Sequence, residues 1–255
     1  MFKSIKVRAS QGRQYIADPR RADPVGFRGA PRVGPTPCKA GCDACVEVCP
    51  TQAIALGQSA DEVRIDLGRC VMCGDCVAEC PTGTLSSSSV FRLASADREG
   101  LLVGSARSAP DPVQVSAALH QLFGRSLKLR SVSAGGCNAC ELELNALNNV
   151  NFDLGRYGID FVASPRHADG VVLTGPITRN MASALQLCWD AMPAPKLVIA
   201  VGACAISGGL FDGSPGLERA FLERFAPTLY VPGCPPHPLT FVCGVLDLLG
   251  MPSNV

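Results

Sequence analysis

The stretch between residues 38 and 80 contains cysteines in two similar blocks, and this repeat limits its possible folds more than any other feature. The first block reads CKAGCDACVEVCPTQAI and the second reads CVMCGDCVAECPTGTL. Both blocks close with Cys-Pro-Thr, and three of their four cysteines recur at a constant interval. Two such blocks in one short stretch predict a small unit in which thiols from both halves meet at shared sites.

The second block has the spacing Cys-x2-Cys-x2-Cys-x3-Cys-Pro, which is typical of bacterial ferredoxins that hold two [4Fe-4S] clusters. In that arrangement the fourth cysteine of each block binds the cluster of the other block. Cluster 1 is predicted to use Cys38, Cys42, Cys45 and Cys80. Cluster 2 is predicted to use Cys70, Cys73, Cys76 and Cys49. The alternative is a scaffold stapled by zinc, because all-thiolate zinc sites also use short spacings.

The first block departs from the ferredoxin spacing, since three residues rather than two separate Cys38 from Cys42. Gly41 can absorb the extra residue as a bulge, because glycine tolerates unusual backbone angles. Without that bulge, we expect the first cluster to be a three-iron form or unusually labile.

Four further cysteines in the second half follow apolar runs that read as strands. They are Cys137, Cys140, Cys204 and Cys234. The first two form a Cys-x-x-Cys pair behind two glycines. In parallel sheets, ligands bind beyond the carboxyl ends of the strands. Four thiolates that converge there can hold one more iron–sulfur cluster.

Residues 127–255 alternate between apolar runs of strand length and longer helical patterns. The predicted strands are 127–132, 160–163, 170–174, 196–201 and 228–231. The predicted helices are 141–150, 179–191, 216–224 and 239–249, preceded by a shorter one within 113–124. This alternation predicts an α/β fold with a doubly wound, mostly parallel sheet. A small α+β ferredoxin-like domain is expected to precede it.

Changes in composition suggest four parts of the chain: an arm (1–37), a ferredoxin domain (38–95), a linker (96–114) and the sheet domain (115–255). The arm carries eight Lys and Arg residues against two Asp residues, a net charge of +6. Two interpretations of it stand: a disordered tail, or an extended arm that lies on an acidic partner surface.

The overall net charge of +1 argues against nucleic acid as a partner. No apolar run has the length of a signal peptide or a membrane span. We therefore expect a cytoplasmic protein whose 14 cysteines are largely reduced and bind metal. Any membrane attachment would come through partner subunits.

The segments FGRSLKLRSVSAGGCNACELELNAL, SPRHADGVVLTGP, VGACAISGG and PGCPP together resemble one family. It comprises the small subunit, which bears the proximal [4Fe-4S] cluster, of energy-converting [NiFe] hydrogenases of the formate hydrogenlyase type, and the homologous NADH-quinone oxidoreductase B subunit. The cysteine blocks resemble the two-cluster ferredoxin subunits of the same complexes. The NADH-quinone oxidoreductase branch characteristically has two adjacent cysteines at the first motif, so Cys137-Asn-Ala-Cys140 is more similar to the hydrogenase branch.

The resemblance implies that Cys137, Cys140, Cys204 and Cys234 bind the proximal cluster, which brings the total to three [4Fe-4S] clusters. It implies an electron-transfer subunit of a membrane-associated hydrogenase-like complex, peripheral on the inner face of the cell membrane. The catalytic metal would lie in a partner that resembles the hydrogenase large subunit, because no Cys-x-x-Cys pairs are left for nickel. The alternative is a subunit of a complex I-like oxidoreductase without nickel, whose partner carries a quinone site.

The family places an acid at Glu143, which suggests a role in proton movement near the cluster. The competing interpretation is a carboxylate that the helix dipole favours in the first turn. His237 stands where family members often have arginine, which weakens the case for an anion or quinone contact there. Two cysteines are left over, Cys188 and Cys243, and both are expected to act as small apolar residues.

Overall fold

The computed structural model describes residues 2–12, 14–57 and 62–252. Its second half is built on a five-stranded parallel sheet with the order β10-β9-β8-β6-β7. The strands are β6 Leu127–Ser133, β7 Ile159–Phe161, β8 Gly170–Thr174, β9 Leu197–Val201 and β10 Leu229–Val231. This is the doubly wound order in which ligands bind where neighbouring connections leave in opposite directions. The predicted fold class is confirmed.

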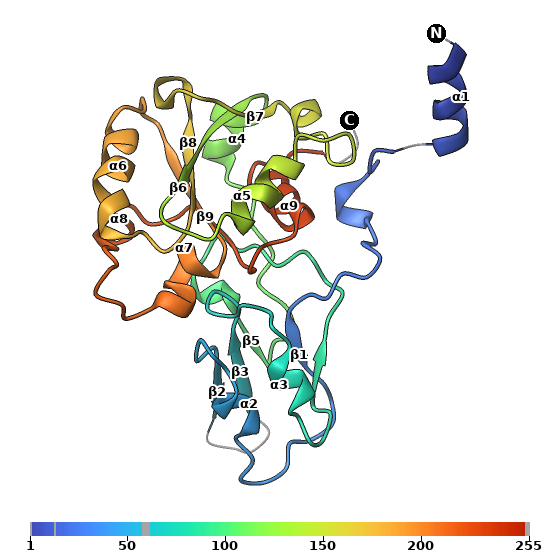
Figure 1. Cartoon of the computed structure of the whole chain (residues 1–255), viewed down its shortest axis with the longest axis vertical. Helices are drawn as coiled ribbons and strands as arrows, with labels where there is room; N and C mark the ends of the chain where they lie inside the picture. Colours follow the sequence, from blue (N-terminus) through green and yellow to red (C-terminus); the bar gives the residue numbers. More distant parts are fainter. Residues whose placement is uncertain (1, 13, 58–61, 253–255) are drawn as a thin grey trace.

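Helices cover both faces of the sheet, as Figure 1 shows. The helices are α4 Ala117–Phe123, α5 Ala139–Ala146, α6 Arg179–Asp190, α7 Ala203–Ser207, α8 Ala220–Arg224 and α9 Pro238–Leu248. α4, α5 and α9 share a hydrophobic core with one face, whereas α6, α7 and α8 share another with the opposite face. β8 and β9 are buried along their whole length, as expected of strands covered on both sides.

The ferredoxin-like module contains two small antiparallel sheets and two helices of one turn each. One sheet pairs β1 Pro31–Val33 with β4 Leu85–Ser87, and the other has the order β2-β3-β5. Its strands are β2 Ile54–Leu56, β3 Val63–Asp66 and β5 Leu102–Gly104, and the helices are α2 Ala44–Glu47 and α3 Asp75–Ala78. Short 3₁₀ turns elsewhere are η1 Pro19–Arg21, η2 Glu99–Leu101, η3 Leu154–Tyr157, η4 Pro165–His167 and η5 Gly209–Phe211.

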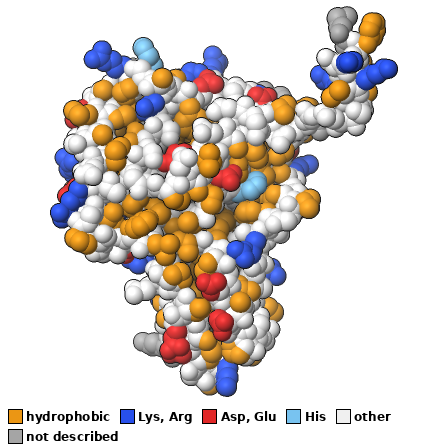
Figure 2. Space-filling view, in the orientation of Figure 1, with side chains coloured by type: hydrophobic (Ala, Val, Ile, Leu, Met, Phe, Trp, Pro, Cys, Tyr) orange, Lys and Arg blue, Asp and Glu red, His pale blue; other side chains and the backbone are white. Residues whose placement is uncertain are grey.

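The two modules share one hydrophobic core. The cluster that contains Ile65 and Leu101 of the small module continues into Leu173, Ala205 and Ile206 of the sheet module. All five side chains are at most 7% exposed. Figure 2 shows hydrophobic side chains also gathered on the surface near this junction. We conclude that the relative position of the modules is fixed by packing.

The predicted linker, 96–114, differs from expectation because it contains strand β5. This strand pairs antiparallel with β3, so that Ile65 lies opposite Val103. Val103 is 5% exposed and belongs to the shared core. The segment therefore completes the small module. A linker between independent bodies would lack such burial.

Beyond its first helix, the basic arm also differs from both interpretations of the sequence. Ile16 N donates to Asn151 O at 2.9 Å, and Arg20 forms an ion pair with Asp247 on α9. The arm then reaches the small module, where β1 pairs with β4. Most of it is thus bound to the chain's own surface. Helix α1, Phe2–Gln11, has no buried residue, and Figure 1 shows it standing away from the rest.

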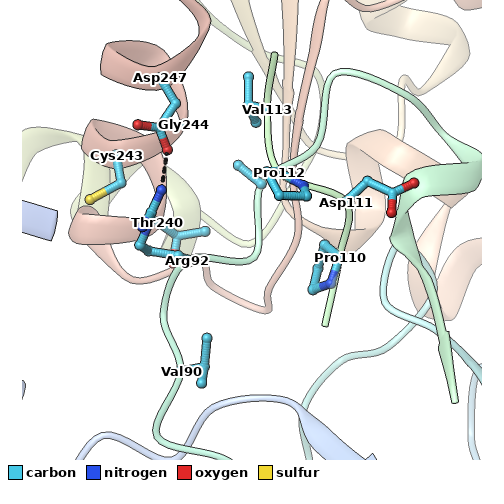
Figure 3. Close-up of a pocket in the computed structure, with 11 residues that line it drawn as sticks. Val90, Arg92, Pro110, Asp111, Pro112, Val113, Thr240, Cys243, Gly244 and Asp247 are labelled. Atoms are coloured by element: carbon cyan, nitrogen blue, oxygen red, sulfur yellow. Dashed lines mark hydrogen bonds and ion pairs between the residues drawn. The ribbon is translucent and has the colours of Figure 1, made fainter. Parts of the chain in front are cut away.

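Asp247 on the last helix, α9, binds side chains from two distant segments of the chain. Asp247 accepts from Arg20 Nε at 2.7 Å and from Arg92 Nη2 at 2.9 Å. Beside it lies a cavity of about 280 Å³ lined by Cys243 and Thr240 of α9 and by residues of segments 90–94 and 110–113 (Figure 3). Cys243 is 1% exposed, which fits its predicted role as a packing residue.

Within the described residues, no helix combines the length and the apolar character needed to cross a bilayer.

Candidate iron–sulfur sites

The structure brings together four cysteines from both blocks around one small cavity. Its lining thiols are Cys38, Cys42, Cys45 and Cys80. Cys45 lies in α2, whereas Cys80 follows α3, and these two short helices pack against each other. We call this group the first quartet. It is the set predicted for cluster 1, including the exchange of the fourth cysteine.

A second cavity is lined by the remaining four cysteines of the repeat. They are Cys49, Cys70, Cys73 and Cys76. We call this group the second quartet. Met72 and Gly74, on either side of Cys73, have positive φ angles of 55° and 92°. These turns bend the chain tightly enough for closely spaced thiols to face one space.

Gly41 occupies the place of the extra residue in the first block. Its φ is +71°, and a β-carbon there would meet nothing within 4 Å. The left-handed backbone agrees with the bulge expected at this glycine. The extra residue does not displace Cys38 from the first quartet's cavity.

Backbone amides donate to the sulfurs that cross between the blocks. Ala53 N lies 3.2 Å from Cys49 Sγ, and Leu85 N lies 3.4 Å from Cys80 Sγ. The hydroxyls of Thr51 and Thr82 lie 3.8 Å from the same two sulfurs. The Cys-Pro-Thr ending of each block thus supplies equivalent donors. Hydrogen bonds to sulfur stabilise thiolates and tune the potential of a bound cluster.

Burial makes the free thiols of the second quartet weak acids. It raises the pKa of Cys70 to about 12 and that of Cys76 to about 11, with neighbouring thiolates acting in the same direction. Four thiolates cannot collect there without a compensating positive charge. The iron of a bound cluster would supply that charge, and its binding would release the protons.

Cys137, Cys140, Cys204 and Cys234 form a third group at the carboxyl ends of β6, β9 and β10. Burial raises the pKa of Cys140 to about 12, and the charges of Glu141 and of the other three cysteines add to the shift. A β-carbon at Gly202 would lie 2.7 Å from Cys140 Sγ and 3.6 Å from Gly233 O. The loops after three strands therefore meet at one place. We call this group the third quartet.

The donors of all three quartets suit an iron–sulfur cluster. Each site offers four thiols, and thiolate ligands select iron–sulfur clusters and zinc. In the described part of the chain, no group of three or more His, Cys, Asp or Glu residues is spaced to hold a single metal ion. The third quartet is the most open, because Cys137 and Cys234 are exposed.

Two carboxylates lie on the helix that carries Cys140. Glu143, the predicted proton-transfer residue, is half-buried, and burial raises its pKa. Burial acts on Glu141 in the same direction, but hydrogen bonds from Ser133 and Thr174 outweigh it and lower the pKa of Glu141. The role of Glu143 in proton movement remains a prediction.

Sequence reasoning missed three residues beside the third quartet: Glu141, Thr174 and Arg219. Thr174 is fully buried, and its hydroxyl lies 2.6 Å from Glu141 Oε1. Arg219 binds the carbonyl of Cys204. The place of Glu141 directly after Cys140 was a usable signal. Arg219 lies in a polar segment with no motif, so only the fold reveals it.

His237 takes part in packing and capping. Its Nδ1 accepts from Leu239 N at 3.1 Å at the start of α9. The rings of Phe27 and Phe152 lie 4.9 and 6.1 Å from its ring, and burial lowers its pKa. Arg166 and His167 are exposed in η4.

Two segments of the chain match known families. Residues 37–84 match the 4Fe-4S dicluster domain, and residues 137–248 match the family described as NADH ubiquinone oxidoreductase, 20 Kd subunit. The first segment contains both cysteine blocks, and the second contains the third quartet.

Among curated proteins, the chain is similar to components of several complexes. The probable membrane-bound hydrogenase subunit mbhJ of Pyrococcus furiosus is 40% identical over 131 residues, which are 51% of this chain and 78% of that protein. Formate hydrogenlyase subunit 7 of Escherichia coli is 39% identical over 137 residues, 54% of each chain. The NADH-quinone oxidoreductase B subunit of Geotalea daltonii is 41% identical over 113 residues, 44% of this chain and 66% of that protein. The matches thus span little more than half of one of these relatives and about two thirds of another.

Proposed function

The chain belongs to the family of the 20 Kd subunit of NADH ubiquinone oxidoreductase, and from this membership we propose that it is the iron–sulfur electron-transfer subunit of a membrane-associated, hydrogenase-like complex. The observation that carries the proposal is the grouping of its cysteines into three quartets. Each quartet would hold one [4Fe-4S] cluster through four thiolates. Bound clusters of this type supply one-electron transfer.

Two contacts support a position of the second quartet between the other two. Cys76 of the second quartet is close enough to Cys45 of the first for their charges to interact. On the other side, Arg69 Nη2 donates to Asp212 Oδ2 at 2.9 Å, which joins the residue before Cys70 to the segment after α7. These contacts support one electron-transfer path that runs from the first quartet through the second to the third.

The surface near the third quartet fits a protein partner. Leu142, Leu210 and Phe211 are 60%, 59% and 48% exposed and lie close to Cys140 and Cys204 in the chain. Exposed apolar side chains beside a redox site favour a docking surface. We propose that the subunit with the catalytic metal or quinone site covers this face, and that other subunits attach the complex to the inner face of the cell membrane.

The basic helix α1 supports a second partner contact. It carries Lys3, Lys6 and Arg8 without an acidic residue, and none of its residues is buried. A helix of this length gains most of its stability from packing. We propose that it lies on an acidic surface of another subunit, the part of the arm for which the sequence prediction still stands.

The hydrogenase branch is the better supported of two functions. The spacing Cys137-Asn-Ala-Cys140 differs from the adjacent cysteines characteristic of the NADH-quinone oxidoreductase branch. The similarity to the Geotalea daltonii protein of that branch keeps a nickel-free, complex I-like assembly as the second candidate. The sequence of the neighbouring large subunit distinguishes them, because a nickel site requires two Cys-x-x-Cys pairs there.

Metal analysis of the full chain tests the central proposal. Anaerobic reconstitution should yield about 12 iron atoms per chain, four for each cluster. Cys204→Ala should lose about four of them, whereas Cys188→Ala, outside every quartet, should lose none. A wild-type protein that saturates at about eight iron atoms would remove the third site, and a colourless protein containing zinc would refute the redox role altogether.

A further inference from the structure

Two groups of opposite charge flank the third quartet on different elements. Glu141 follows Cys140 in α5, and Arg219 binds the loop that carries Cys204. Both side chains are held by hydrogen bonds to other parts of the chain. They are therefore fixed charges beside the candidate cluster site.

Glu141 is held at the ends of two adjacent strands. Its Oε1 accepts from the hydroxyl of Thr174, the last residue of β8, at 2.6 Å. The side chain of Ser133, the last residue of β6, also donates to it. Thr174 is fully buried, and its hydroxyl lies closer to this carboxylate than to its other acceptor, Val132 O, at 3.3 Å. Both donors stabilise the ionised form of Glu141.

Arg219 is held by backbone carbonyls. Its Nη1 donates to Pro176 O and Cys204 O, both at 3.1 Å. Its Nη2 donates to Ala205 O at 2.8 Å and to Ile206 O at 3.0 Å. These bonds fix the guanidinium against α7, the helix that presents Cys204. Burial lowers the pKa of Arg219, and the charges of Asp212 and Cys204 oppose this shift.

We propose that Glu141 and Arg219 shift the reduction potential of the third cluster in opposite directions. Reduction adds one electron and makes the cluster more negative, so a nearby carboxylate disfavours it and a nearby guanidinium favours it. Glu141 therefore lowers the potential and Arg219 raises it. Both are positioning residues, because neither is a ligand. The inference rests on the proposed third cluster and adds to it the residues that tune it.

Redox titration of the reconstituted full chain, followed by electron paramagnetic resonance with dithionite and mediators, tests this inference. Glu141→Gln removes the charge and keeps the shape, so the potential of the third signal should shift upward. Arg219→Gln should shift it downward, and Arg219→Lys should leave it close to the wild-type value. The signals of the two ferredoxin-type clusters serve as internal references and should not move.

Two further variants separate charge from structure. Glu218→Gln removes an exposed carboxylate next to Arg219 and should leave the potential unchanged, because solvent screens it. Thr174→Val keeps the charge of Glu141 but removes its donor, so it should shift the potential less than Glu141→Gln. If Arg219→Gln does not reconstitute, the comparison of Glu141→Gln with Thr174→Val decides whether the charge of Glu141 sets the potential.

The inference is overturned if the third signal is present but Glu141→Gln leaves its potential unchanged or lowers it. It is also overturned if Glu218→Gln shifts the potential as much as Glu141→Gln does, since any surface charge would then have the same effect on the cluster. A wild-type protein without a third signal refutes instead the proposed three-cluster function. The two failures are therefore distinguishable in one series of measurements.

Discussion

Arg69 Nη2 donates to Asp212 Oδ2 at 2.9 Å and thereby links the cysteine repeat to the parallel-sheet module. The neighbouring Gly68 has no room for a side chain, because a β-carbon there would lie 2.8 Å from Ile206 Cγ2 and 2.9 Å from Arg98 Cζ. The junction of the modules thus combines a partly exposed ion pair with tight packing. The two contributions differ in strength and can be separated.

We predict that Gly68→Val destabilises the protein more than Arg69→Ala. Added side-chain atoms in a packed site cost about 1–3 kcal/mol, whereas a partly exposed ion pair contributes about 0.2–1 kcal/mol. The anaerobic melting temperatures of the two variants and the wild type check this order. An equal or larger effect of Arg69→Ala would show that the ion pair, and not packing, holds the modules together.

A second prediction concerns Asp247, which binds Arg92 (Figure 3) and also Arg20. Asp247→Asn removes the charge that two arginines share, so we expect a loss of about 2–4 kcal/mol, less than for a fully buried pair. The arm should also become more sensitive to proteases between residues 14 and 30. Asp190→Asn, an exposed acid on α6, is the matched control and should change neither property. Equal protease resistance in both variants would contradict the anchoring role.

The sequence predicted the elements whose side chains are buried by a regular pattern. The apolar runs at 170–174 and 196–201 became β8 and β9 with nearly the same bounds, because strands covered on both faces must be apolar throughout. α7 was missed because a helix of five residues has no periodicity to detect. The two cluster sites of the cysteine repeat could be predicted because the spacing of their ligands is short in the sequence.

Contacts between distant segments could not be predicted from the sequence. β5 is a short strand, and only its pairing with β3 distinguishes it from a linker. The arm looked unstructured because its stability comes from partners such as Asn151 and Asp247 far along the chain. Arg219 became meaningful only when the fold placed it against Cys204.

A third prediction uses the glycine before α7. Gly202 has a φ of +89°, and a β-carbon there would lie 2.7 Å from Cys140 Sγ. Gly202→Ala should therefore displace the thiol and remove about four iron atoms per chain. Gly213→Ala is the matched control, because Gly213 has a φ of +75° but nothing within 4 Å of the added carbon. Similar iron losses in both variants would assign the effect to backbone strain alone.

The exchange of the fourth cysteine gives a fourth prediction. Cys45 and Cys80 line one cavity, whereas Cys49 lines the other. The double variant Cys45→Ala/Cys80→Ala should therefore lose one cluster, about four iron atoms. Cys45→Ala/Cys49→Ala, although confined to one sequence block, should lose two clusters, about eight iron atoms. The reverse pattern in the iron content would mean that each block binds its own cluster.

The last prediction concerns His237, whose pKa is lowered by burial among Phe27, Phe152 and the first turn of α9. Because burial in the folded protein disfavours the protonated imidazole, the unfolded chain binds more protons as the pH falls through the ordinary value of about 6.5. The contribution of His237 to stability is therefore present above this pH and is lost below it. His237→Asn keeps a side-chain acceptor for the helix start but does not titrate. Between pH 7.5 and about 5.5, the melting temperature of the wild type should fall more steeply than that of the variant. Parallel curves would show that the imidazole is protonated equally in the folded and unfolded states.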